Sequence, residues 1–391
     1  MRTAPIFKLF LLFASFLTAF EACCLQAVSA RTTSNVRRES AAIPERTRVL
    51  HSRNYFYVGG TYNTTVADAA AISSGQMYVE HLVPQFVTRK YPIVMIHGNG
   101  MTGTNFLNTP DGRPGWTDFF LNKGYELYIV DQPSRARSPW QQTIDGPQYM
   151  VDTVTVEQRF TATAKYNMWP KASLHTQWPG NGTRGDKIFD DFYRTIVPAL
   201  SSNVEASQKF RPVGAALLDR IGPAIIMTHS QSGQNGWPLA DDRPSLVKAI
   251  IAIEPVGPPF TNAIFPPIVP ARPYGLTEVS MTFSPPIQSA SDIETVVVSS
   301  SENYTCIQQA SPPRKLVNLA NIPVLLVTSE TGYHTVYDDC IRDFLTDAGV
   351  PVDHVNLGDV GIHGNGHMMF MEENRFEIAE KVLHKWLEEK L

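Results

Sequence analysis

The stretch Thr228-His229-Ser230-Gln231-Ser232-Gly233 decides how the fold of this chain is interpreted. The apolar run at 223–227 directly before it predicts a buried strand, and the residues from Gln231 onward predict a helix. A strand, a sharp turn with a serine at its apex and a helix together form a nucleophile elbow. The alternative is a polar turn without chemistry, because serine pairs are common in loops.

The choice between the two serines depends on the size of their neighbours. The elbow turn is so tight that the residues two positions before and after the nucleophile must be small. Ser230 has Thr228 and Ser232 at these positions, whereas Ser232 has the bulky Gln234 two positions after it. The pattern therefore favours Ser230 as the nucleophile.

Outside this stretch, apolar runs alternate with helical patterns. Buried strands are expected at 91–96, 126–130, 247–253, 323–328 and 352–357, and helices at 116–122, 188–200, 204–220, 337–347 and 374–390. Unbroken apolar strands separated by helices are typical of an α/β fold, with a mostly parallel central sheet and helices on both faces. Two further strands are expected at 55–59 and 76–83, with Asn63 in the turn region between them.

Two long segments break this alternation. Residues 134–186 and 256–301 are rich in proline and aromatic residues and show no clear period. Loops of this length in a compact domain are usually functional lids. We therefore expect both segments to belong to a lid over the site.

A serine nucleophile needs a base and an acid that orients the base. In a sheet of this kind the chain order is nucleophile, acid, histidine. The glycine-rich loop at 361–367, between the last strand and the last helix, offers His363 and His367, and the position just before the helix favours His367. For the acid, Glu254 and Glu330 each end a predicted strand after the elbow, and the pattern alone leaves both open.

Two backbone N–H groups are expected to form an oxyanion hole beside the nucleophile. One belongs to Gln231, the residue after Ser230, and the other to the loop His97-Gly98-Asn99-Gly100, with Asn99 as the candidate. Preorganised donors of this kind contribute about 10²–10³-fold each to the rate.

Composition excludes several classes of function. The chain has 391 residues, 43% of them hydrophobic and 18% charged, with a net charge of −4. This balance is globular and gives no indication of a nucleic-acid or anionic-membrane partner. No phosphate-binding glycine-rich string and no histidine pair at metal-ligand spacing stands out, so no cofactor and no metal are expected.

The N-terminus is typical of a secretory signal peptide. Arg2 and Lys8 precede or flank an apolar core, and Val28-Ser29-Ala30 resembles a cleavage site. We predict a signal peptide at 1–30, a polar arm at 31–50 and the catalytic domain at 51–391, with an uncleaved signal anchor as the alternative.

Cysteines and sequons fit the same compartment. Cys306 and Cys340 remain after signal removal, and in an oxidising compartment they predict one disulfide, with two separate buried thiols as the alternative. The sequons that start at Asn63, Asn181 and Asn303 are candidate N-glycosylation sites.

Five segments carry a resemblance to a known family: 97–100, Asp131-Gln132-Pro133-Ser134-Arg135, 229–233, Ile253-Glu254-Pro255 and Gly364-Asn365-Gly366-His367. Together they resemble the α/β-hydrolase superfamily, and within it the secreted 713-type esterase group. The resemblance implies Ser230 as nucleophile, His367 as base and Glu254, rather than Glu330, as acid. The 256–301 segment departs from that group and leaves the substrate pocket undefined.

The expected function is a secreted serine esterase that hydrolyses a small-molecule carboxylic ester or lactone through an acyl-enzyme. The same elbow also serves acyl transfer, C–C bond hydrolysis and lyase steps of secondary metabolism. A catalytically idle binding protein on the same scaffold is the remaining alternative.

Overall fold

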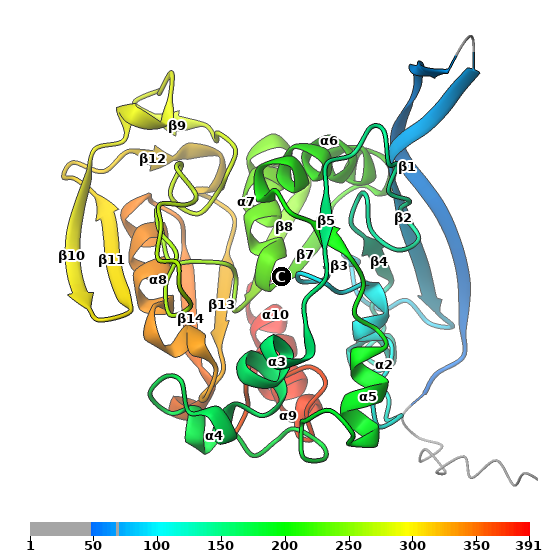
Figure 1. Ribbon diagram of the computed structural model, residues 1–391. Coiled ribbons are helices and arrows are strands. Elements are labelled where there is room, and N and C mark those ends of the chain that lie inside the picture. The colour runs from blue at the N-terminus through cyan, green and yellow to red at the C-terminus, as the bar shows by residue number, and fades with distance from the viewer. Residues whose placement is uncertain (1–47, 68–69) are drawn as a thin grey trace, which may run out of the picture. The chain divides into compact units, whose positions relative to one another are not determined.

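A computed structural model describes residues 48–67 and 70–391 (Figure 1). These residues belong to one compact unit, Glu45–Leu391. The predicted signal peptide at 1–30 lies outside the described residues, as does all of the predicted arm at 31–50 except its last three positions. Within the described part of the chain, no helix combines the length and the apolarity needed to cross a membrane.

The core of the fold is a sheet with the strand order β1-β2-β4-β3-β7-β8-β13-β14. Its strands are β1 (His51–Ala67), β2 (Ala70–Pro84), β3 (Ile93–Ile96), β4 (Leu127–Asp131), β7 (Ala224–His229), β8 (Val247–Ile253), β13 (Val324–Thr328) and β14 (Val352–Asn356). The strands from β4 to β14 pair in parallel, and the β1–β2 hairpin adds antiparallel at one edge. The predicted mostly parallel sheet is confirmed.

Helices accompany the strands in sequence and in space (Figure 1). The main ones are α2 (Trp116–Asn122), α5 (Lys187–Tyr193), α6 (Asn203–Ile221), α7 (Gly233–Asp242) and α8 (Asp338–Asp347). The C-terminal helical run consists of α9 (Arg375–Ile378), the π-helical η10 (Ala379–His384) and α10 (Lys385–Lys390). The hydroxyl of Ser202 begins α6 by accepting the Glu205 N–H at 3.1 Å, as a preferred N-cap residue does.

Alternate side chains of each buried strand pack on opposite faces of the sheet. In β7, Ile226 belongs to one hydrophobic cluster, together with side chains from α6, α7 and α8. Its neighbours Ile225 and Met227 belong to a second cluster, with α2 and the C-terminal helical run. This two-residue period explains why the central strands are apolar throughout.

Two local predictions were wrong. The β1–β2 hairpin is longer than expected, so Asn63 pairs with Ile72 inside it and does not lie in the turn. The β-branched residues that surround Asn63 favour an extended chain. The helix predicted at 188–200 ends at Tyr193, because Pro198 lacks an N–H and disfavours helical geometry in the residue before it.

The two irregular segments contain short elements. Residues 134–186 include β5 (Gln148–Tyr149), α3 (Thr153–Val156), the π-helical η3 (Glu157–Thr161), α4 (Thr163–Tyr166) and η4 (Ala172–Leu174). Residues 256–301 include β9 (Phe283–Ser284), η6 (Ala290–Asp292) and β10 (Thr295–Ser301). The strand β10 pairs with β11 (Tyr304–Gln309).

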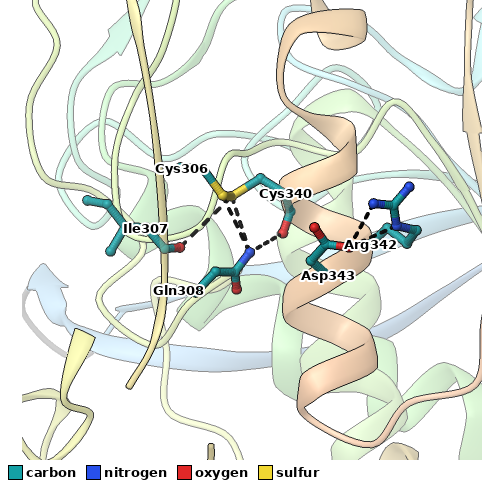
Figure 2. Close-up of a disulfide and its surroundings, with 6 residues drawn as sticks. All are labelled: Cys306, Ile307, Gln308, Cys340, Arg342 and Asp343. Carbon is teal, nitrogen blue, oxygen red and sulfur yellow. Dashed lines mark hydrogen bonds and ion pairs between the residues drawn. A yellow bond between two sulfur atoms is a disulfide. The ribbon is translucent and has the colours of Figure 1, made fainter. Parts of the chain in front are cut away.

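The predicted disulfide is confirmed. Cys306 on β11 is bonded to Cys340 on α8, with 5.8 Å between their Cα atoms (Figure 2). The side-chain amide of Gln308 donates a hydrogen bond to the Cys340 carbonyl at 2.8 Å, beside the sulfur atoms. The bond therefore joins the β10–β11 hairpin to a helix that packs on the central sheet.

Candidate active site

Ser230 lies at the end of β7, where the chain turns into the short η5 (Ser230–Ser232) and then α7. Its φ is 56°, a value that is strained for a residue with a side chain and typical of a nucleophile elbow. The loop after β3 approaches this turn closely. A Cβ added at Gly98 would lie 3.0 Å from the Ser230 Cβ, so glycine is required there.

Ser232 has a different place in the turn. Its side chain is fully buried, and its hydroxyl donates to the Ile96 carbonyl at 2.8 Å. The same oxygen accepts the His229 N–H at 2.9 Å. Ser232 thus ties the turn to β3, and Ser230 is the serine that lines the neighbouring cavity.

His367 and Glu254 form a buried pair. The Nδ1 atom of His367 lies 2.6 Å from Glu254 Oε2, and both side chains are at most 1% exposed. Because a carboxylate can only accept, Nδ1 carries the proton and Nε2 is the unprotonated nitrogen. The second oxygen, Oε1, accepts the Ser329 backbone N–H at 2.8 Å and the Ser329 hydroxyl.

The Glu254 carboxyl is held in its charged form. Burial alone raises the pKa of a carboxyl group, but the nearby His334 and the interactions with His367 and Ser329 outweigh burial and lower the pKa of Glu254 to about 2. Burial lowers the pKa of His367, and the Glu254 carboxylate only partly offsets this effect. At neutral pH the pair therefore consists of a carboxylate and a neutral imidazole that can accept a proton.

The other candidates for base and acid bind each other. His363 Nδ1 lies 2.9 Å from Glu330 Oε1, and the Gly364 N–H donates to Glu330 Oε2 at 2.7 Å. The His363 side chain is 65% exposed. This second pair joins the loop after β13 to the 361–367 loop and has no bond to His367 in the described chain.

A cavity of about 240 Å³ opens at Ser230 and His367. Its walls come from the loop after β3 and from the first irregular segment, including residues 149–152, Arg159 and Phe160. The Phe160 ring stacks on the His367 imidazole at 5.2 Å between centroids. The 256–301 segment reaches this region through Phe265. Just outside the cavity, the Phe265 ring packs against the Arg159 guanidinium and against two aromatic rings.

Hydrogen bonds fix the orientation of two peptide carbonyls next to the site. The Gly98 carbonyl accepts from Arg135 Nη1 and His97 Nδ1, each at 2.9 Å. The Ser230 carbonyl accepts the Val256 N–H at 2.9 Å. In a trans peptide the N–H points opposite to the C=O. These contacts therefore direct the N–H groups of residues 99 and 231 away from the donors that bind the two carbonyls. Such fixed donors can stabilise a negative oxygen.

The chain is similar to known proteins at the level of sequence and fold. No protein-family model matches the chain. The chain is 46% identical over 349 residues to a protein named probable secreted lipase phiG from Fungal sp. (strain ATCC 74256), which covers 88% of this chain and 92% of that one. The chain is an α/β-hydrolase. It belongs to the family of esterases and lipases with this fold.

A solved structure agrees with this assignment at the level of the fold. The hydrolase superposes on a novel bacterial esterase, determined at atomic resolution, with a TM-score of 0.54 and 21% sequence identity. The match covers 87% of this chain and 96% of the bacterial one.

Sequence reasoning overlooked Arg135 as a side chain of this hydrolase's site. Arg135 is 3% exposed and contacts the Gly98 carbonyl and, at 3.3 Å, the Gln231 side chain. Burial lowers the pKa of Arg135 to about 10, so the guanidinium stays charged at neutral pH. Arg135 belongs to a segment that carried the family resemblance, and that resemblance was the available signal.

Tyr333 was also overlooked. Its hydroxyl lies 3.4 Å from His367 Nε2. Burial and the Glu254 carboxylate raise the pKa of Tyr333, so the hydroxyl stays protonated at neutral pH. Its position shortly after β13 was the only signal in the sequence.

Another buried histidine, His334, stacks on His367. The rings of His334 and His367 are 5.1 Å apart and nearly parallel, at 9°. One atom from each of Glu254, His334 and His367 falls within 4.8 Å of the other two, close enough for shared metal ligands. However, the His334 nitrogens are bonded to Asp338 at 2.9 Å and Tyr337 at 3.1 Å, and His367 Nδ1 is bonded to Glu254. These atoms already have protein partners.

Proposed function

We propose that this α/β-hydrolase is a secreted serine esterase in which Ser230, His367 and Glu254 act as a catalytic triad. The observation that carries the proposal is the 2.6 Å contact between His367 Nδ1 and the buried Glu254 carboxylate, at a cavity that Ser230 lines. This contact fixes the tautomer in which Nε2 can accept the serine proton.

In the proposed reaction, the Ser230 oxygen attacks the ester carbonyl while His367 Nε2 takes the hydroxyl proton. Glu254 stabilises the imidazolium that forms. The backbone N–H groups of Asn99 and Gln231 bind the oxyanion. His367 then returns the proton to the leaving alcohol, and a water molecule, activated by the same base, hydrolyses the acyl-enzyme to the acid.

The resting arrangement leaves one contact to be completed. Tyr333, rather than Ser230, supplies the hydroxyl within 3.4 Å of His367 Nε2. Catalytic hydrogen bonds are often long or misaligned without substrate and tighten in the complex. We propose that substrate binding brings the Ser230 hydroxyl onto Nε2 in place of Tyr333.

The size of the cavity supports a small ester as substrate. Its volume of about 240 Å³ corresponds to roughly eight water molecules. Phe160, Met101 and Val151 supply apolar contacts along the wall. The segments at 134–186 and 256–301 are proposed to act together as a lid, because Arg159 of one packs on Phe265 of the other.

Secretion is proposed from three consistent features. The related fungal protein is named a secreted lipase, the N-terminus has the composition of a signal peptide, and Cys306 is bonded to Cys340. Asn181 and Asn303 are exposed and are proposed to carry N-linked glycans, whereas Asn63 is only partly exposed.

The experiment is a hydrolysis assay with p-nitrophenyl esters of graded acyl length. Ser230→Ala is expected to lower kcat by about 10⁴-fold or more. The matched control is Ser232→Ala, two positions away, which removes a structural hydroxyl and is expected to retain most of the activity of the folded enzyme. Loss of activity in Ser232→Ala alone would reassign the nucleophile. Transfer of the acyl group to an added alcohol, without release of acid, would favour an acyltransferase.

A further inference from the structure

Arg159 brings an unpaired positive charge to the cavity. It lies on η3 and lines the same cavity as Ser230. Its guanidinium carbon is 3.9 Å from the centroid of the Phe265 ring. Within residues 48–67 and 70–391, the guanidinium forms no salt bridge and no hydrogen bond with the protein.

The neighbouring carboxylates have other partners. Asp152, which also lines the cavity, accepts the Thr155 N–H at 2.9 Å and the Thr155 hydroxyl at 2.7 Å. Glu157, on the same turn as Arg159, accepts the Tyr166 hydroxyl at 2.6 Å and a backbone N–H at 2.9 Å. Glu254 is bonded to His367. None of these acids neutralises Arg159 directly.

The local geometry sets the orientation of the guanidinium. Arg159 and Phe160 are neighbours on a π-helical turn, a rare element that occurs frequently at functional sites. Here it sends Phe160 onto the His367 ring and the adjacent Arg159 onto Phe265. A guanidinium is planar, so one that lies over an aromatic face leaves the N–H groups at its edge available to the two oxygens of a carboxylate.

The charge is also close to the reacting groups. Arg159 lines the same cavity of about 240 Å³ as Ser230 and His367. The next residue, Phe160, stacks on the His367 ring at 5.2 Å between centroids. A ligand group bound to Arg159 would therefore lie within one small molecule's length of the serine.

We propose that Arg159 binds a carboxylate of the ester substrate, so that the enzyme prefers esters that carry a free carboxylic acid, such as half-esters of dicarboxylic acids. This inference rests on the proposed esterase function of Ser230 and names its substrate class. Partial desolvation in the cavity strengthens such a charge-assisted contact relative to one at an open surface.

The test compares charged and neutral esters of the same shape. Monoethyl glutarate is paired with its isostere, in which an isopropyl group replaces the carboxylate. Butanoylglycolate and isobutyl butanoate form a second pair with the carboxylate on the alcohol side. The wild type is expected to prefer the charged member of at least one pair by about 10–100-fold in kcat/KM, the range of a hydrogen bond to a charged group.

Arg159→Met keeps the length and apolar stem of the side chain without its charge. It is expected to reduce that preference by the same factor, and Arg159→Lys is expected to restore part of it. Arg184→Met is the matched control, since Arg184 is an exposed arginine of the same segment outside the cavity lining. It should leave the preference unchanged.

The inference would be overturned if the wild type had equal kcat/KM for the charged and the neutral ester of each pair. It would also be overturned if Arg159→Met lowered kcat/KM equally for the charged and the neutral ester. In either case the esterase function would stand. If the wild type cleaves neither kind of ester and Ser230 takes no covalent label, the proposed function fails, and the inference fails with it.

Discussion

Replacing Glu254 with glutamine removes one charge at a fully buried position without changing the shape of the side chain. The Ser329 backbone N–H, 2.8 Å from Oε1, requires an acceptor. The single carbonyl oxygen of glutamine therefore stays with Ser329, and its NH₂ group faces His367 Nδ1. Since NH₂ can only donate, Nδ1 must accept and the imidazole proton moves to Nε2. That is the atom that should accept the proton of Ser230.

The expected loss is large. The same tautomer error in the chymotrypsin triad lowers kcat by about 10⁴-fold. We expect Glu254→Gln to lower kcat by about 10³–10⁴-fold, or about 4–5.5 kcal/mol of transition-state stabilisation. The assay is steady-state hydrolysis of p-nitrophenyl butyrate at pH 7.5, with circular dichroism to verify folding.

The control is Glu330→Gln. Glu330 contacts His363 and the Gly364 N–H rather than His367, so its replacement should change kcat by less than about tenfold. If Glu330→Gln costs more activity than Glu254→Gln, or if folded Glu254→Gln keeps more than about a tenth of wild-type kcat, the tautomer argument is refuted.

The remaining predictions concern three other features. Tyr333→Phe frees His367 Nε2 from a competing hydroxyl, so it should raise kcat/KM by about 2–10-fold, whereas a hundredfold loss would make the hydroxyl catalytic. Because the pKa of His367 is lowered and the imidazole must be neutral, kcat/KM should rise with pH around a midpoint below 6.5. His334→Phe removes a charge that lowers this pKa and should move the midpoint upward; an unchanged profile would contradict the coupling. Replacing Cys306 and Cys340 with alanine removes a cross-link between residues 34 positions apart. The free energy of unfolding should fall by about 4 kcal/mol, which corresponds to a Tm decrease on the order of 5 °C in scanning calorimetry.

The sheet could be predicted from the sequence because burial on both faces requires unbroken apolar strands. The runs at 91–96 and 247–253 become β3 and β8 for that reason. The lengths of the exposed hairpin and of α5 could not be predicted as well. Asn63 lies in a polar stretch whose pairing depends on the partner strand, and the end of α5 depends on Pro198 acting against a helical pattern.

The site could be predicted only in part, because the decisive contacts join distant segments. Glu254 and Glu330 occupy equivalent positions after strands, and sequence pattern alone does not separate them. The folded chain separates them by which histidine each carboxylate meets, across 113 residues for Glu254 and 33 for Glu330. Arg159 is similar, since an arginine of an irregular segment that lacks a carboxylate partner is recognised only when its surroundings are known.

The central claim is that Ser230 is the nucleophile of an esterase, and covalent labelling tests it most directly. The folded enzyme is treated with a fluorophosphonate, digested and mapped by mass spectrometry, alongside Ser230→Ala. The account predicts one adduct, on Ser230, that is absent from the variant and forms much more slowly in Glu254→Gln. An adduct on Ser232, or a folded wild-type protein that hydrolyses esters without any adduct at Ser230, would contradict it.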